Sequence, residues 1–285
     1  MKIHMWKRTS KPLPLTTDGR LRLFFVGVGS AFSKTHNQTN VLVIKGRDHL
    51  LIDCGTKCPQ AFHELGLPIT AVRTFLITHS HADHIGGLEE AALMGRYFAK
   101  RKPSMIITEE YKRLLWDLSL KGGIAFGELV DGRPLEFEDV FDPIYPAPVD
   151  TLDRQAWRVA CGSISLTLFR TRHIPDSAPS WREAFFSQGV IIDDRVVFSS
   201  DTQFDPGLIA ACETACAPEA IFHDCQFFTG GVHASLEEIG TLPASVRKKT
   251  FLMHYGDNAA QFRSRIRQLE LAGLARQNAC YDFLP

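Results

Sequence analysis

Short apolar runs recur along the chain, separated by turn residues and by amphipathic stretches. The runs LRLFFVG (21–27) and RTFLI (73–77) are rich in β-branched and aromatic residues, which predicts buried strands. NVLVIKGRDHLLI (40–52) and FFSQGVIIDDRVVF (185–198) predict two hairpins, and GGLEEAALMGRYFAK (86–100) has the spacing of a helix. Strands interleaved with helices in both halves of the chain favour two packed sheets with helices outside them.

Several predicted strands end in histidine or aspartate. The run at 73–77 leads into THSHADHIGG (78–87), where three histidines and one aspartate are crowded between His79 and His84. Other strand ends carry His173, Asp201, His223 with Asp224, and His254. Because strand ends lie at one rim of a sheet, these side chains can converge there.

The spacing H-x-H-x-D-H indicates a metal site, because imidazole nitrogen and carboxylate oxygen suit Zn²⁺, Mn²⁺ or Fe. The candidate donors are five histidines and two aspartates, enough for two ions if one carboxylate bridges them. Two adjacent metals activate a water molecule and hold a phosphoryl oxygen. The candidate metal ligands are His79, His81, Asp83, His84, His173, Asp201 and His254.

Composition narrows the class of protein. Of 285 residues, 45% are hydrophobic, and Lys+Arg and Asp+Glu are 32 each, so no overall charge favours a long nucleic acid or an anionic membrane. No apolar stretch approaches about 18 residues, and the basic residues at the N-terminus precede no apolar run, so neither a transmembrane helix nor a signal peptide is expected. The seven scattered cysteines suggest reduced thiols and a cytoplasmic protein.

These motifs resemble the metallo-β-lactamase superfamily, whose fold is a four-layer αββα sandwich of the mixed α/β class. The likeness is carried by LLIDCG, THSHADHIGG, His173, SSDT and MHYGD. It implies an N-terminal arm at 1–20 and a single domain of this fold at 21–285. By resemblance, His79, His81 and His173 hold one metal, Asp83, His84 and His254 hold the other, Asp201 bridges them, and Asp53 and His223 support the ligands.

Within the superfamily, the chain looks like the RNase Z branch. FFVGVGSAF (24–32) resembles the opening strand and turn of that branch, although G-x-G-S could also be a tight turn that needs glycine at positive φ. By resemblance, His233 of GGVHASLEEI protonates the leaving oxygen. Asp224 is its expected partner, but the branch has Glu at the comparable place. Ser235 with Glu238 also predicts a helix N-cap, a purely structural explanation for that segment.

The short link between His173 and Asp201 holds no glycine- and lysine-rich arm of the kind that grips tRNA in long-armed RNase Z enzymes. The layout is similar to that of the anti-Pycsar phosphodiesterases, which degrade cyclic mononucleotide signals. The resemblance implies two divalent ions, Zn²⁺ first, and hydrolysis of a small phosphodiester, with a 3′,5′-cyclic nucleotide as the expected substrate. A bridging hydroxide would attack phosphorus, Asp83 would help to hold its proton, and His233 would act as general acid. Two loops are candidates for the nucleotide pocket: His36, Asn37 and Asn40 in one, Ser177 and Trp181 in the other.

Three alternatives stay open: an RNase Z-type tRNA 3′ endonuclease, a thioesterase of the glyoxalase II kind, and a metal-binding domain without catalysis. The thioesterase would leave His233 unused, and a domain that lost its chemistry would be expected to lack ligands. The branch also implies a homodimer.

Overall fold

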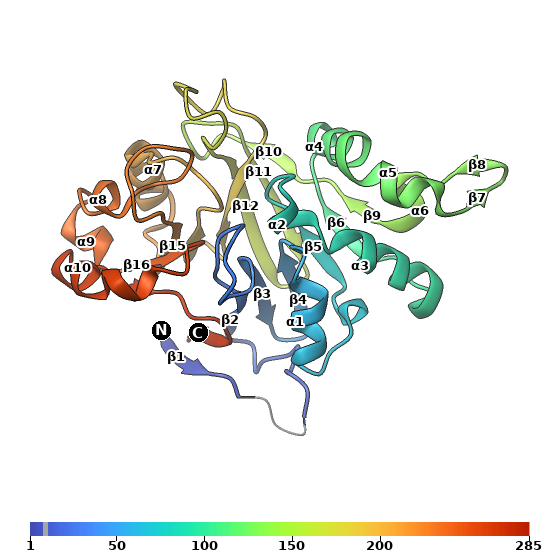
Figure 1. The fold of residues 1–285 in the computed structure, drawn as a ribbon, viewed down its shortest axis with the longest axis horizontal. Coiled ribbons are helices and arrows are strands. Elements are labelled where there is room, and N and C mark those ends of the chain that lie inside the picture. The colour runs from blue at the N-terminus through green and yellow to red at the C-terminus, as the bar shows by residue number, and fades with distance from the viewer. Residues whose placement is uncertain (8–10, 285) are drawn as a thin grey trace. The chain divides into compact units, whose positions relative to one another are not determined.

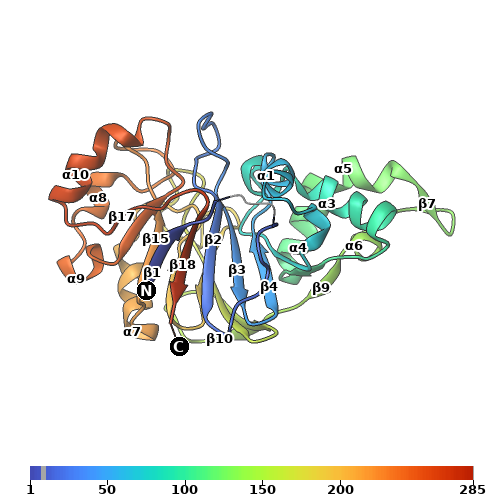
Figure 2. The same cartoon turned by 90° about the horizontal axis from the view of Figure 1, so that it is seen from below.

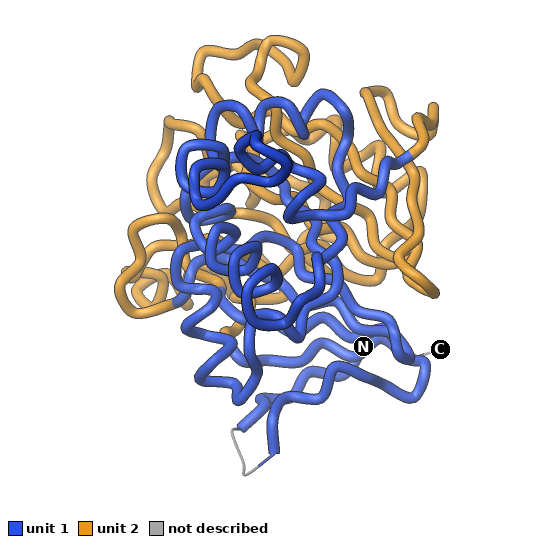
Figure 3. Tube along the Cα trace, turned by 90° about the vertical axis from the view of Figure 1, so that its right-hand side faces the viewer, with its two compact units in different colours: residues 1–27, 37–146, 278–285 blue, residues 28–36, 147–277 orange. Residues whose placement is uncertain are grey.

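The computed structural model describes residues 1–7 and 11–284, which form two compact units (Figure 3). The first unit comprises residues 1–27, 37–146 and 278–285, and the second comprises residues 28–36 and 147–277. Each unit contains one eight-stranded sheet.

The sheet of the first unit is antiparallel at one side and parallel at the other. Pairing is antiparallel from β1 to β4 and parallel from β4 to β9. The carboxyl ends of β4, β5 and β6 therefore lie at the same edge of the sheet. The order is β1 (Lys2–Met5), β18 (Ala279–Phe283), β2 (Leu21–Gly27), β3 (Asn40–Lys45), β4 (Asp48–Ile52), β5 (Thr74–Leu76), β6 (Ser104–Ile106) and β9 (Asp142–Ile144).

The helices of the first unit follow β4, β5 and β6 along the chain. The helix expected over 86–100 is present as α3, which continues into the π-helical turn η2. Helices α4, α5 and α6 lie near one another, with the small hairpin β7–β8 beyond them (Figure 1). The bounds are α1 (Cys58–Glu64), η1 (Ile69–Ala71), α2 (Ala82–Ile85), α3 (Leu88–Met94), η2 (Gly95–Ala99), α4 (Glu109–Leu115), η3 (Trp116–Leu120), α5 (Lys121–Ile124), η4 (Ala125–Gly127), β7 (Leu129–Val130), β8 (Arg133–Pro134) and α6 (Phe137–Val140).

The second unit repeats this layout with a different sequence. Its sheet is antiparallel from β10 to β14 and parallel from β14 to β17. A core cluster joins Leu208 of α7, Ile239 of α8 and Ile266 of α10 to Leu252 of β16, so these helices pack on the sheet. The bounds are β10 (Ala147–Val149), β11 (Ala156–Cys161), β12 (Ile164–Arg170), β13 (Gln188–Ile192), β14 (Val196–Phe198), α7 (Pro206–Cys216), β15 (Ala220–Asp224), α8 (Leu236–Ile239), α9 (Ala244–Arg247), β16 (Thr250–Met253), η5 (Ala259–Phe262), α10 (Arg263–Gln268) and β17 (Gly273–Leu274).

Both expected hairpins are present, as β3–β4 and β13–β14. The segment 1–20, expected as an arm, contains strand β1, which pairs with the C-terminal strand β18 (Figure 2). The side chains of β1 are all exposed, so neither burial nor alternation marks the strand in the sequence. Within residues 1–7 and 11–284, no helix is long and apolar enough to cross a membrane.

The glycines of FFVGVGSAF allow neighbouring segments to pack closely against the backbone. Neither Gly27 nor Gly29 has a positive φ, so the turn explanation for them was wrong. A Cβ on Gly27 would lie 2.0 Å from the backbone oxygen of Gln38. Glycine at this position lets the chain at Gln38 pass directly against β2.

Gly27→Ala is therefore expected to lower the free energy of unfolding by about 1–3 kcal/mol, the usual cost of overpacking. Urea denaturation followed by circular dichroism measures this change. The matched control is Gly122→Ala in α5, where a Cβ would meet no atom within 4 Å and alanine favours the helix. An equal loss in both variants would contradict the packing argument.

Candidate metal centre

The metal loop of the first unit is organised by Asp53, directly after β4. Its carboxylate is fully buried and accepts hydrogen bonds from the backbone N–H of Thr78 at 2.8 Å and from Nδ1 of His84 at 2.7 Å. Burial raises the pKa of Asp53, although His84 and Thr78 favour its ionised form. Asp53 thus joins the end of β4 to the loop after β5, and it fixes which nitrogen of His84 faces away from it.

The remaining donors of this unit lie close to His84. Helix α2 begins after His81, so that Asp83 lies in its first turn and His84 in its last. Nε2 of His84 is 3.2 Å from Oδ2 of Asp83, and Nε2 of His79 is 3.0 Å from Nδ1 of His81. His79, Asp83 and His84 are buried, whereas His81 is exposed. A histidine held between two carboxylates requires a second proton or a metal ion on its outer nitrogen.

In the second unit, three donors follow the ends of β12, β14 and β16. Oδ2 of Asp201 lies 3.3 Å from Nε2 of His254 and 3.8 Å from Nε2 of His173, and all three residues are buried. Nδ1 of His173 lies 2.9 Å from the carbonyl oxygen of Val232, so this nitrogen carries the hydrogen. Asp201 is the carboxylate toward which both imidazoles turn.

The donor chemistry fits divalent metal ions. Burial lowers the pKa of His173 to about 4, although the charge of Asp201 opposes the shift, so the ring is neutral at pH 7. With hydrogen on Nδ1, the lone pair of Nε2 faces an oxygen of Asp201. Two lone pairs facing each other repel unless a cation lies between them. Histidine whose other nitrogen is held by a carbonyl or carboxylate is the usual form of a metal ligand.

His233 and Asp224 form a hydrogen-bonded pair in the second unit. Nδ1 of His233 donates to Oδ2 of Asp224 at 2.8 Å, and the ring centroid of His233 lies 5.0 Å from those of His173 and of His254. Asp224 is fully buried, whereas the His233 side chain is 23% exposed. Burial acts to raise the pKa of Asp224, but hydrogen bonds from His223 and His233 outweigh it, and the pKa is lowered. The expected partnership between Asp224 and His233 is thus present as a contact.

His223 lies on the other side of Asp224. Its Nδ1 contacts the backbone oxygen of Asp224 at 2.8 Å and Oδ1 of the same residue at 3.1 Å. Burial lowers the pKa of His223, but the contacts with Asp224 raise it by more, so the net shift of the pKa is upward. The N-cap expected at Ser235 is also present, as a capping box with Glu238.

The five residues expected to contact substrate differ in their exposure to solvent. Asn40 is buried: its amide donates to the oxygen of Gln38 at 2.5 Å and accepts from the N–H of Gly55 at 2.7 Å. Because both ends of the amide are engaged, Asn40 holds the loop after β4, and its contact with substrate stays a prediction. The other four are at least partly exposed: His36, Asn37, Ser177 and Trp181.

Two supporting groups were not expected from the sequence. Thr78 donates to Asp53 from its backbone and its hydroxyl, and its position directly before His79 was an available signal. The carbonyl of Val232 holds His173 across 59 residues of chain. A backbone acceptor has no signature in the sequence, so only the fold reveals it.

Comparison with known proteins identifies the family and the fold. The family model "Anti-Pycsar protein Apyc1" matches residues 21–281. The Anti-Pycsar protein Apyc1 of Bacillus phage vB_BsuM-Goe3 is 38% identical over 263 residues, covering 90% of this chain and 97% of that protein. Apyc1 of Paenibacillus harenae is 37% identical over 246 residues, covering 86% of this chain and 94% of that protein.

Among solved structures, the metallo-β-lactamase fold protein YhfI from Bacillus subtilis superposes with a TM-score of 0.68 at 15% identity, covering 93% of this chain and all of that one. This likeness shows that the chain has the metallo-β-lactamase fold. The family model and the phage relative show the family as well as the fold, because each match extends over most of this chain. The chain belongs to the anti-Pycsar Apyc1 family.

Proposed function

We propose that the protein is a two-metal phosphodiesterase that hydrolyses a small nucleotide, most specifically a 3′,5′-cyclic nucleotide. The observation that supports metal binding is that Nε2 of His254 and Nε2 of His173 both face Oδ2 of Asp201, at 3.3 Å and 3.8 Å. Family membership supports the choice of a small signalling nucleotide. The proposed ligands are His79, His81, Asp83, His84, His173, Asp201 and His254.

When bound, two divalent ions would lower the pKa of a water molecule and neutralise the phosphoryl oxygens. The chain's own contribution begins with Asp53 and the carbonyl of Val232, which fix the tautomers of His84 and His173. Fixed tautomers keep Nε2 available as a donor atom without reorganisation.

His233 is the proposed general acid. Its Nδ1 is held by Asp224, which stabilises a protonated ring and orients Nε2. An imidazole with a pKa of about 6.5 is suited to donate a proton to an alkoxide leaving group near neutral pH. The partial exposure of His233 fits a residue that contacts substrate, and the full burial of Asp224 fits one that positions it.

The segment between His173 and Asp201 supports a small substrate. It contains only turns, bends and the hairpin β13–β14. Trp181 lies in it, and the guanidinium of Arg182 is 4.5 Å from the ring. We include His36, Asn37, Ser177 and Trp181 as candidate contacts to the nucleotide. The single domain over 21–285, the homodimer and the cytoplasmic location stay predictions.

A substrate screen tests the proposal. Cyclic mononucleotides, 2′,3′-cyclic nucleotides, a tRNA precursor and S-lactoylglutathione are each incubated with Zn²⁺ or Mn²⁺. Fastest turnover of a 3′,5′-cyclic nucleotide is expected. Faster cleavage of the tRNA precursor or the thioester would replace the proposal with the corresponding alternative. No hydrolysis, combined with fewer than about one metal ion per chain, would favour a non-catalytic domain.

A further inference from the structure

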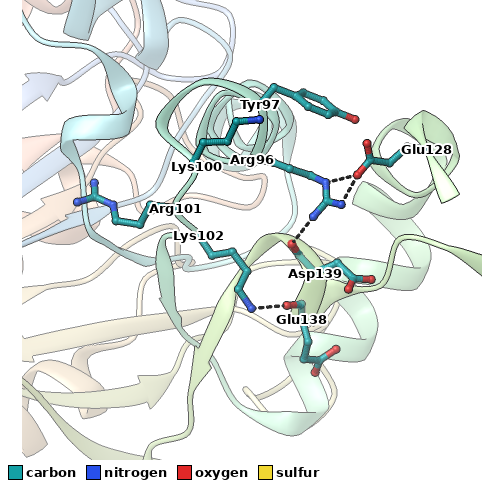
Figure 4. A pocket seen from close by; sticks show the side chains of 8 residues that line it. All are labelled: Arg96, Tyr97, Lys100, Arg101, Lys102, Glu128, Glu138 and Asp139. Carbon is teal, nitrogen blue, oxygen red and sulfur yellow. Dashed lines mark hydrogen bonds and ion pairs between the residues drawn. The ribbon is translucent and has the colours of Figure 1, made fainter. Parts of the chain in front are cut away.

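Two hollows in the first unit differ in how their charges are balanced. The first, of about 640 Å³, is lined by both cations and carboxylates (Figure 4). Glu128 binds Arg96, Glu138 accepts from Lys112 at 2.8 Å, and Asp139 accepts from Arg133 at 2.6 Å. Its four lining cations, Arg96, Lys100, Arg101 and Lys102, face three lining carboxylates, so this hollow offers little net charge to a ligand.

The second hollow is lined by cations without carboxylates. It has a volume of about 540 Å³, and we call it the arginine pocket. Its guanidinium groups come from the β3–β4 turn, from the residue before β5 and from the segment between η2 and β6. Its lining residues are Leu15, Thr16, Arg47, His49, Ala71, Arg73 and Arg101.

The arginines of this pocket are not neutralised. Among residues 1–7 and 11–284, Arg47 and Arg73 have no ion pair, and the guanidinium of Arg101 donates only to the carbonyl oxygen of Thr70 at 2.6 Å. The chain as a whole has a formal net charge of zero. Three uncompensated guanidinium groups on one concave surface are therefore a local excess of positive charge. Like charges gathered this way repel one another, and an anion would relieve the repulsion.

The positive charge of the pocket also acts on His49, which lines it. The residue is buried, and its Nε2 lies 3.1 Å from the carbonyl oxygen of Ala71. Burial lowers the pKa of His49, the charges of Arg73 and Arg101 lower it further, and Asp48 opposes them. Two of the three arginines therefore act directly on this imidazole.

The arginine pocket is separate from the proposed metal ligands. Arg73 precedes β5 and His79 follows it, and β4 likewise runs from Asp48 at one end to Asp53 beyond the other. With a rise of about 3.3 Å per residue, the two ends of these strands are on the order of 15–20 Å apart. The pocket lies at the opposite edge of the first sheet from the metal loop, so the proposed hydrolysis does not use it.

We propose that the arginine pocket is a second, non-catalytic site for a small ligand bearing two or more phosphate groups. Guanidinium groups bind phosphate through paired hydrogen bonds, and three of them around one hollow suit several phosphoryl oxygens together. The hollow is open to solvent, and its volume of about 540 Å³ suits a small molecule, whereas a long polyanion would need an extended basic stripe.

The test is calorimetric titration of the metal-loaded protein with inorganic pyrophosphate, with a nucleoside triphosphate and with a single-stranded oligonucleotide. Arg47→Gln/Arg73→Gln is expected to weaken pyrophosphate binding by about 100-fold or more, since two guanidinium groups that donate charge-assisted hydrogen bonds are removed. Arg113→Gln, an exposed arginine of α4 that lines neither hollow, is the matched control and should bind as the wild type does.

Two further measurements separate this site from the metal centre. Binding to the arginine pocket should persist in Asp201→Asn, and hydrolysis of bis(p-nitrophenyl) phosphate should be unchanged in Arg47→Gln/Arg73→Gln. Phenylglyoxal labelling of Arg47 and Arg73 in wild-type protein, mapped by mass spectrometry, should be slowed by pyrophosphate, and this readout needs no variant to fold.

Three outcomes would overturn the proposal. Pyrophosphate that binds the double variant and the wild type equally would place the anion elsewhere. An equal loss in Arg113→Gln would mean diffuse attraction rather than a site. Oligonucleotide binding that depends on the arginines, without pyrophosphate binding, would identify a nucleic-acid surface instead.

Discussion

His233→Ala is expected to reduce kcat for a 3′,5′-cyclic nucleotide by about 10²–10⁴-fold, the usual contribution of a general acid. The ribose oxygen that leaves is a poor leaving group and needs a proton as the bond breaks. The p-nitrophenolate ion leaves without one, so hydrolysis of bis(p-nitrophenyl) phosphate by the same variant should fall by less than about tenfold. The ratio of the two losses is the quantity to measure.

A structural role for His233 would give a different pattern. If the variant loses both activities equally, the imidazole only holds the site, and the general-acid assignment is wrong. Asp224→Asn provides a second comparison, because Asn retains the size of the residue while weakening the bond to Nδ1 of His233. It should depress cyclic nucleotide hydrolysis and alter the pH profile, whereas His63→Ala, on the exposed side of α1, should change neither.

Asp201→Asn is expected to remove metal from the protein and activity with it. In the second unit, Oδ2 of Asp201 faces Nε2 of His254 and of His173. The amide has nearly the same shape but lacks the negative charge that would hold a cation among these imidazoles. Metal affinity should fall by more than about 100-fold, since even the loss of a residue that only supports a ligand costs about 10–100-fold.

Metal content by plasma mass spectrometry and hydrolysis of bis(p-nitrophenyl) phosphate measure these effects. Asp176→Asn is the control, because Asp176 is exposed in the loop after His173. Wild-type metal content together with wild-type turnover in Asp201→Asn would contradict the proposed ligand set. Wild-type metal content with lost turnover would instead assign Asp201 to catalysis alone.

The strand periodicity and the H-x-H-x-D-H spacing were sufficient to name the candidate donors. A buried strand must be apolar along its length and can carry polar chemistry only where it ends. For that reason the positions of His79, His173, Asp201 and His254 after their strands could be predicted. Strand β1 could not be predicted, because its side chains are exposed and its place depends on pairing with β18, more than 270 residues away.

The order of residues was enough to predict the candidate nitrogen and oxygen donors, the strands and hairpins, and, through family resemblance, the metallo-β-lactamase fold. The folded chain was needed to show which nitrogen of His84 and of His173 is held, that Asn40 accepts from the backbone of Gly55, and that His233 lies at hydrogen-bond distance from Asp224. It also gathered Arg47, Arg73 and Arg101, which are scattered in the sequence, around one hollow. This is because periodicity reflects burial and local spacing, whereas a hydrogen bond to a backbone carbonyl or an uncompensated charge depends on which distant segments the sheets bring together.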